Sequence, residues 1–172
     1  MRNTWIRRIS AIRKDGVESA INLTCGLNCI IGASNTGKTR IAKTVEFACG
    51  GKELPFTDKT AYEIAQVTFV TNGGEVSLSR SIHVQNTIHV KSSNPMIVPG
   101  SYSVSSRAGK SINTVLLALL GVESTRRIAT NETYHTVAFT WNAIRHLMIV
   151  PEDQIGRARP SILFPKSTSI GR

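Results

Sequence analysis

The sequence predicts a mixed α/β fold, and three neighbouring features predict it. Residues 32–39 read Gly-Ala-Ser-Asn-Thr-Gly-Lys-Thr, which fits the phosphate-loop pattern G-x-x-x-x-G-K-S/T at every fixed position. A short β-prone run, Leu27–Ile31, precedes this loop, and an amphipathic stretch, Arg40–Ala48, follows it. A strand, a glycine-rich loop and a helix in this order are typical of nucleotide-binding proteins. The loop is therefore the first candidate site.

The residue types of the loop suit the binding of phosphate. Gly32 and Gly37 let the backbone wrap closely around a phosphate, so that successive N–H groups point at its oxygens. Lys38 can reach the β- and γ-phosphates of ATP, and the Thr39 hydroxyl can hold Mg²⁺. The N-terminal dipole of the expected helix adds positive potential. For Arg40 the alternative is a solvated position on the surface of the helix. The expected nucleotide contacts are Gly32, Ala33, Ser34, Asn35, Thr36, Gly37, Lys38, Thr39 and Arg40.

Two antiparallel strands are expected before the loop strand. Trp5–Ile12 and Val17–Leu23 are β-prone, Lys14–Gly16 is a turn between them, and Gly26 turns the chain towards the loop. Basic residues surround this strand pair: Arg7, Arg8, Arg13 and Lys14. They predict a contact patch for a phosphate backbone, with a charged edge strand that protects the sheet as an equal alternative.

The helix after the loop and the next strands have clear local signals. Ile41, Val45 and Ala48 share one helical face, and Gly50-Gly51 ends the helix. Further on, the pattern predicts a loop over 52–59 and then a hairpin, in which Tyr62–Val70 and Glu75–Ile82 flank a turn at Asn72–Gly74. A short strand over Thr87–Val90 and an exposed connection over 91–110 are expected to follow. Arg80 near the hairpin end is expected either to contact nucleotide or DNA, or to lie exposed.

The last third predicts two helices. Ser111 is a candidate cap for a helix through Val115–Leu120, which Gly121 closes. Apolar residues in 139–150 have helical spacing, but Leu147–Val150 is β-prone. Because acidic Glu152 and Asp153 follow that run, it is also the nearest candidate for a strand that ends in catalytic acids, interrupted by Pro151.

Composition limits the classes of protein. A chain of 172 residues is long enough for one domain with a core. Its 21 Lys and Arg outnumber 11 Asp and Glu, and the net charge of +10 favours a polyanionic partner such as DNA, with a solvated basic surface as the alternative. No apolar run approaches the roughly 20 residues that cross a bilayer, and no secretory signal is visible. We expect a soluble, cytoplasmic protein without a membrane partner.

The three cysteines show no zinc-binding spacing and leave at least one thiol unpaired. Cys25 and Cys29 flank the expected loop strand, where free cysteine behaves as a small buried hydrophobe. Neither a disulfide framework nor a cysteine metal site is expected.

The stretch Leu23–Thr39 resembles the opening of SMC-like ATPases, the group that includes the DNA-repair proteins SbcC, RecN and RecF. The helix end at Val45–Gly50 and the hairpin that ends in Arg80 are similar to theirs as well. The resemblance implies a P-loop NTPase fold of the ABC/SMC type. It implies in particular the N-terminal lobe of such a head, with antiparallel strands ahead of and after the loop unit.

The resemblance also implies roles for residues near the C-terminus. The segment Phe139–Ile155 is similar to the one that leads into the Q-loop of these ATPases. By this resemblance Gln154 would touch Mg²⁺ or the attacking water, and Glu152 competes for that position. The implied catalytic residues are then Lys38, Gln154 and Glu152, and the implied Mg²⁺ ligands are Thr39 and Gln154.

A complete head has a second half, with a Leu-Ser-Gly-Gly signature and a strand ending in Asp-Glu, and neither is visible in residues 1–172. We therefore expect one incomplete lobe that binds ATP weakly and hydrolyses it only with a C-terminal half, a second head or a homodimer partner. The implied role is DNA repair, chromosome maintenance or phage defence. The alternatives are a small kinase or NTPase that uses Glu152 or Asp153, and a nucleotide-binding module without turnover.

Overall fold

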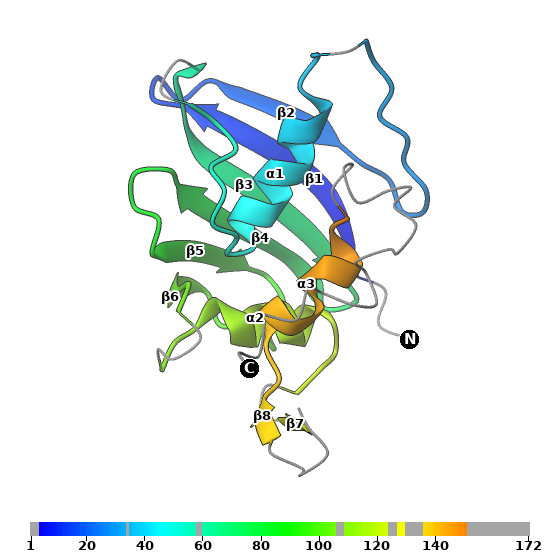
Figure 1. The fold of residues 1–172 in the computed structure, drawn as a ribbon, viewed down its shortest axis with the longest axis vertical. Coiled ribbons are helices and arrows are strands. Elements are labelled where there is room, and N and C mark those ends of the chain that lie inside the picture. The colour runs from blue at the N-terminus through cyan, green and yellow to red at the C-terminus, as the bar shows by residue number, and fades with distance from the viewer. Residues whose placement is uncertain are drawn as a thin grey trace, which may run out of the picture.

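An antiparallel six-stranded sheet forms the body of the protein in the computed structural model (Figure 1). The structure describes residues 4–33, 35–57, 60–105, 109–123, 127–129 and 136–150. The sheet has the order β2-β1-β3-β4-β5-β6. Its strands are β1 (Trp5–Arg13), β2 (Glu18–Asn22), β3 (Tyr62–Thr71), β4 (Gly74–Ser81), β5 (Thr87–Ser92) and β6 (Gly100–Ser103). A small separate hairpin joins β7 (Arg127–Ala129) and β8 (Thr136–Ala138).

The expected strand pairs form because apolar side chains alternate along them and local turns set their register. The β3–β4 hairpin places Val67 opposite Leu78 and Phe69 opposite Val76. Val67, Val76 and Leu78 are fully buried on the covered face, whereas Ser77 and Ser79 belong to the opposite face. The pairing of β2 with β1 confirms the strand pair predicted before the loop.

Helix α1 (Lys38–Ala48) crosses the covered face over β1, β3 and β4 (Figure 1). Phe47 and Ala48 are fully buried there, and Ile41 and Val45 pack on a cluster that includes Val67. Gly50 follows with a φ of 95°, a left-handed conformation that favours glycine. The predicted helix and its glycine stop are thus confirmed.

Two further helices, α2 (Ile112–Leu119) and α3 (Trp141–Met148), extend the core. Ser111 caps α2 by accepting a hydrogen bond from the Asn113 N–H at 3.3 Å, as its position predicts. The backbone N–H of Trp141 donates to the Asn113 side chain, which ties α3 to α2. None of the helices in the described parts of the chain is long and apolar enough to cross a membrane.

The prediction of an exposed connection over 91–110 is wrong in part. This stretch contains β6, and it buries Ile97 and Tyr102, which are 5% and 7% exposed. Tyr102 lies opposite Ile88 in the β5–β6 pair. Serine, glycine and proline dominate the composition here. One apolar anchor in a four-residue edge strand and one in the turn before it are too weak a pattern to find from sequence.

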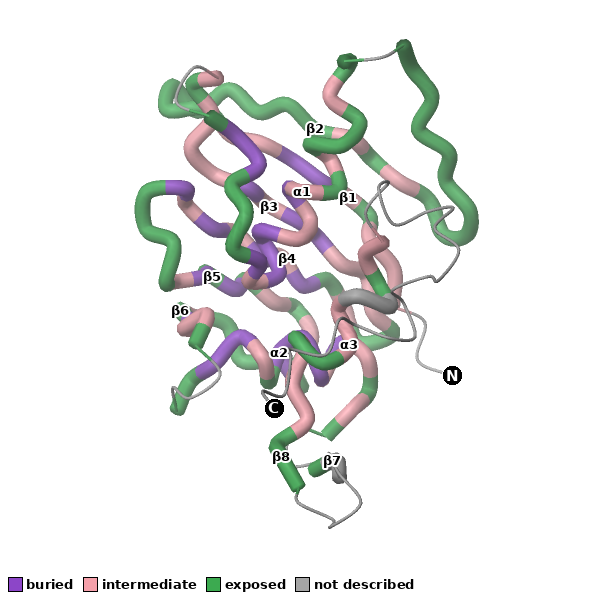
Figure 2. Tube along the Cα trace, in the orientation of Figure 1, coloured by how far each residue is buried: buried purple, intermediate pink, exposed green. Residues whose placement is uncertain are grey.

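The predicted loop strand over Leu27–Ile31 is not formed. Residues 23–33 have neither strand nor helix assignment and run outside the sheet as an exposed segment (Figures 1 and 2). Leu27 and Ile31 are both 92% exposed. A buried strand of this kind needs a parallel neighbour, and every strand pair of the described sheet is antiparallel.

The β-prone run Leu147–Val150 does not form a strand either. Leu147 and Met148 complete α3, and residues 149–150 follow it with neither helix nor strand assignment. The architecture is therefore mixed α/β around an antiparallel sheet. That is the coarse class the sequence predicts, and the finer assignment to the P-loop NTPases stays a prediction.

Candidate phosphate-binding loop

The glycine-rich loop lies where the exposed segment meets the N-terminus of α1 (Figure 1). Gly37 is the N-cap of the helix, with a φ of 89°. Asn35 is also left-handed, with a φ of 62°, a conformation that asparagine tolerates better than most residues. Two left-handed residues within three positions bend the backbone sharply. Such bends form concave groups of N–H donors that bind anions.

The loop closes on itself through Gly32 and Thr36. A Cβ atom at position 32 would meet the Thr36 hydroxyl oxygen at 2.9 Å, so this contact requires a glycine or a shift of Thr36. The Thr36 hydroxyl donates to the Ala33 carbonyl at 2.8 Å. The first glycine of the pattern therefore allows a close contact with Thr36, whereas its predicted close approach to a phosphate stays a prediction.

Lys38 lies over the loop. Its Nζ donates to the Gly32 carbonyl at 2.8 Å and to the Ala33 carbonyl at 2.5 Å. The ammonium group is exposed and has no carboxylate partner among the described residues. The Thr36 hydroxyl is a third, longer contact of this ammonium group, at 3.4 Å. A cation held by neutral oxygens at the positive end of a helix forms stronger, charge-assisted bonds once an anion arrives.

The structure supplies part of the predicted site. Thr39 and Arg40 are exposed in the first turn of α1, beside Lys38. Ser34, Glu152 and Gln154 lie outside the described residues, so their predicted roles stay predictions. Within the described ranges, no three His, Cys, Asp or Glu side chains gather as metal ligands, which leaves Thr39 as the described candidate for Mg²⁺.

The opposite end of α1 is held by Arg80, whose role the sequence did not predict. The side chain is 3% exposed, and its Nη1 donates to the carbonyls of Phe47 at 2.6 Å and Gly51 at 2.7 Å. Its Nε and Nη2 donate to the Gln85 carbonyl, and its guanidinium lies 4.0 Å from the Phe47 ring centroid.

Arg80 is therefore a buried cap on the C-terminus of α1, where a cation complements the helix dipole. Burial lowers the pKa of its guanidinium to about 10. Both expectations for this residue, contact with nucleotide or DNA and exposure, are wrong. The alternation of side chains along β4 could have revealed this burial, because Val76, Leu78 and Arg80 stand at every second position and so share one face of the strand.

The basic residues of the first strands are largely paired with carboxylates. Arg7 forms an ion pair with Glu75, and Arg8 bonds Glu18 at 2.7 Å. Arg13 lies 3.3 Å from Asp15. The hydrogen bond from Arg8 lowers the pKa of Glu18. These ion pairs weigh against a patch for a phosphate backbone. The charged-edge alternative is also wrong for β1, because β1 lies between β2 and β3 inside the sheet.

The prediction that Cys25 and Cys29 are buried is wrong. Cys25 and Cys29 are exposed, because the strand that was to bury them is not formed. Cys49 is buried, and desolvation, together with the nearby Glu46 charge, raises the pKa of its thiol to about 12.

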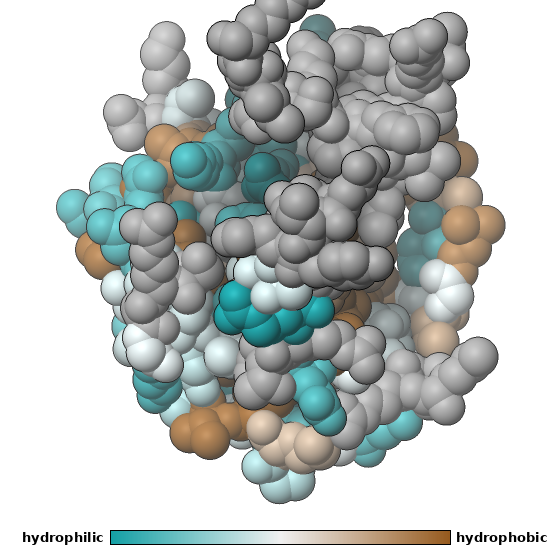
Figure 3. All heavy atoms as spheres, turned by 60° about the horizontal axis from the view of Figure 1, so that its bottom comes forward, coloured by the Kyte–Doolittle hydropathy of each residue, from teal (hydrophilic) through white to brown (hydrophobic). Residues whose placement is uncertain are grey.

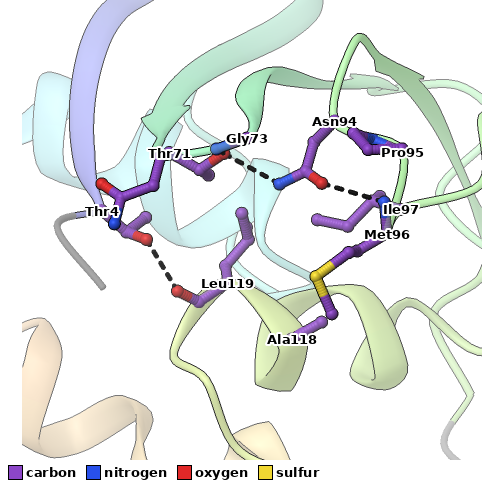
Figure 4. A pocket seen from close by; sticks show the side chains of 10 residues that line it. Thr4, Thr71, Gly73, Asn94, Pro95, Met96, Ile97, Ala118 and Leu119 are labelled. Carbon is purple, nitrogen blue, oxygen red and sulfur yellow. Dashed lines mark hydrogen bonds between the residues drawn. The ribbon is translucent and has the colours of Figure 1, made fainter. Parts of the chain in front are cut away.

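A cavity of about 320 Å³ lies elsewhere, between the β3–β4 turn, the loop after β5 and α2 (Figure 4). Three of its polar side chains, Thr4, Thr71 and Asn94, are hydrogen-bonded to their surroundings. Thr4 donates to the Leu119 carbonyl at 2.8 Å, and the Asn94 amide donates to Thr71 at 2.9 Å. On the face seen in Figure 3, described hydrophobic and hydrophilic side chains lie in small mixed groups. Neither feature rivals the loop as a candidate site.

These observations define a class: a mixed α/β protein with a glycine-rich, lysine-bearing loop at a helix N-terminus. No protein-family model matches the sequence, and comparison with curated proteins gives no match. The function is therefore argued from the residues and geometry of the loop.

Proposed function

We propose that the chain binds the phosphates of ATP, with Mg²⁺, at residues 32–39 as the N-terminal lobe of an SMC-like ATPase. The observation that carries this proposal is the placement of Lys38. Its ammonium group lies on the Gly32 and Ala33 carbonyls at the N-terminus of α1, inside a complete phosphate-loop pattern. A lysine held in this way is available to exchange carbonyl partners for phosphate oxygens.

Each part of the loop has a separate role in the proposal. The first N–H groups of α1 have no partner within the helix, so they are donors for phosphate. Lys38 neutralises the β- and γ-phosphates, and the Thr39 hydroxyl is a ligand for the Mg²⁺ that accompanies them. Gly32 and Gly37 provide the close approach and the left-handed turn.

Hydrolysis in this proposal requires a second half-head or a homodimer partner. The exposure of Leu27 and Ile31, 92% each, supports that requirement. Burying one such side chain is worth about 1.5–3 kcal/mol, so a polypeptide that covers this segment gains binding energy from it. A role on DNA rests on the net charge of +10, because the arginines of the first strands are paired with carboxylates.

A second candidate is a nucleotide-binding module without turnover. The exposed segment 23–33 favours this candidate, because it places no sheet strand directly before the loop in the described structure. A small kinase would depend on Glu152 or Asp153, which lie outside the described residues.

Titration of the chain with ATP and Mg²⁺, measured by calorimetry, tests the proposal. Lys38→Ala is expected to weaken binding at least about tenfold, because it removes a charge-assisted bond worth about 1.5–3 kcal/mol. Lys43→Ala is the matched control: Lys43 lies on the same helix but pairs with Glu53 at 3.3 Å. It is expected to bind within about twofold of the original chain. Equal affinities for all three proteins would refute the proposed site.

The dependence of ATP turnover on protein concentration separates the two candidates. If two heads must pair, the rate of ATP hydrolysis rises more steeply than linearly with protein concentration. A binding module without turnover hydrolyses no ATP. A linear rate from the single chain would instead support the small-enzyme alternative.

A further inference from the structure

After β2 the chain turns at a corner before it runs to the phosphate loop (Figure 1). Two exposed cysteines flank the residue that holds this corner. Cys25 and Cys29 are four positions apart, and neither is covered by the sheet or by α1. The third cysteine, Cys49, is buried in the core. The chain therefore presents one close pair of accessible thiols and one inaccessible thiol of the same kind.

The corner between the two cysteines is held by Asn28. Its side-chain oxygen accepts from the Thr24 N–H at 3.0 Å, and its amide donates to the Thr24 carbonyl at 2.8 Å and the Gly26 carbonyl at 3.1 Å. Gly26 has a φ of 103°, which reverses the chain. These bonds bring residue 28 back towards residue 24, and these two residues are the chain neighbours of Cys29 and Cys25.

We propose that Cys25 and Cys29 form a thiol–disulfide exchange site. Its substrate class is a low-molecular-weight disulfide such as glutathione disulfide. One thiol loses its proton, and the thiolate attacks a sulfur of that disulfide, so that a mixed disulfide forms and one thiolate leaves. The second cysteine, as thiolate, attacks the protein sulfur of the mixed disulfide. A bond between Cys25 and Cys29 results, and two molecules of the small thiol are released after taking up the two protons.

A disulfide between Cys25 and Cys29 cannot form while residues 25–29 are extended as a strand. An extended chain advances about 3.3 Å per residue, so a strand separates the Cα atoms of residues 25 and 29 by about 13 Å. A disulfide requires Cα atoms within about 7 Å. Oxidation therefore fixes the turned form, and only the reduced chain can extend residues 25–29 to pair with another polypeptide.

Oxidation of the whole chain in glutathione redox buffers, followed by alkylation, trypsin digestion and mass spectrometry, tests the site. Trypsin places Cys25 and Cys29 together in the peptide 15–38 and Cys49 alone in the peptide 44–52. The first peptide is expected to lose about 2 Da, the mass of two hydrogens, while Cys49 stays reduced and unmodified. Stable glutathione adducts without ring closure, a disulfide-linked dimer, or equal oxidation of Cys49 would overturn the proposal.

Substitution of Asn28 tests the part that the corner plays. Asn28→Ala leaves both thiols in place but removes four hydrogen bonds, including one from the Thr24 hydroxyl, and is expected to lower the ring-closure constant about tenfold. Cys25→Ser abolishes closure and leaves a glutathione adduct on Cys29. An unchanged constant in Asn28→Ala would overturn the inference that this corner prepares the pair.

A nucleotide readout extends the test and rests on the proposed function. The loop begins three residues after Cys29, and the disulfide prevents residues 25–29 from extending into the strand that precedes a phosphate loop in nucleotide-binding proteins. The oxidised chain is therefore expected to bind ATP about tenfold more weakly than the reduced chain, and reduction restores the affinity. A reduced chain that binds no ATP would refute the proposed function. In that case the peptide map would still show whether the disulfide between Cys25 and Cys29 forms. Disulfide formation with unchanged affinity would refute the coupling alone.

Discussion

The two ends of helix α1 differ in how they are held. At the C-terminal end Phe47 and Ala48 are fully buried, and Arg80 satisfies the Phe47 and Gly51 carbonyls with its guanidinium. At the N-terminal end Lys38, Thr39 and Arg40 are exposed, and Lys38 bonds only to the loop before it. One helix thus joins a fixed core to an open loop (Figure 2).

This difference separates stability from function along a single element. Buried bonds at the C-terminal end fix the direction of the helix axis, so the N-terminal dipole points at one place. Exposure at the other end leaves the backbone donors and Lys38 free to meet a ligand. Substitutions at the two ends should therefore change different quantities.

The largest effect is expected from Arg80→Ala. It leaves the buried Gly51 carbonyl without its donor, which costs about 1–3 kcal/mol, and it removes the bonds to the Gln85 carbonyl and the contact with the Phe47 ring. The Phe47 carbonyl loses one of two donors and keeps the Gly50 N–H. We expect the free energy of unfolding, measured with urea, to fall by about 3 kcal/mol or more. Lys38→Ala is the control at the other end and is expected to change it by less than about 0.5 kcal/mol. Similar losses in the two variants would contradict the contrast between the ends.

An intermediate effect is expected from Gly37→Ala. Position 37 has open space for a Cβ, so the cost comes from its φ of 89° and amounts to about 1–2 kcal/mol. Gly16→Ala is matched, because its φ is 83° and its surroundings are equally open. Both variants should lose similar stability in urea, but only Gly37→Ala should weaken ATP binding in calorimetry. Equal ATP affinities would argue against a phosphate site at residue 37.

The parts of the fold that were predictable from sequence are those with local signals. The turn at Asn72–Gly74, the cap at Ser111 and the stop at Gly50 depend on neighbours within a few positions, and all three appear as expected. The glycine loop belongs to the same group, since its left-handed residues and close contact lie within residues 32–37.

The parts that were not predictable depend on distant partners. The role of Arg80 requires carbonyls 33 and 29 positions away, which no local pattern reveals. Leu27–Ile31 has the composition of a buried strand, but a strand also needs a neighbour, and this segment pairs with no strand of the described sheet. The wrong prediction that Cys25 and Cys29 are buried has the same origin, because it depended on this strand. The roles of Ser34, Glu152 and Gln154 stay predictions.

The smallest effect is expected from the double variant Leu27→Ser, Ile31→Ser. These side chains are 92% exposed, so replacing them removes almost no buried contact and should change the free energy of unfolding by less than about 0.5 kcal/mol. Leu78→Ala provides the buried comparison: Leu78 is 0% exposed, and its truncation should cost about 2–5 kcal/mol. Urea denaturation at several protein concentrations measures both. A loss above about 1.5 kcal/mol in the double variant would mean that the segment is covered in solution. If that loss grew with protein concentration, a second copy of the chain would be what covers it.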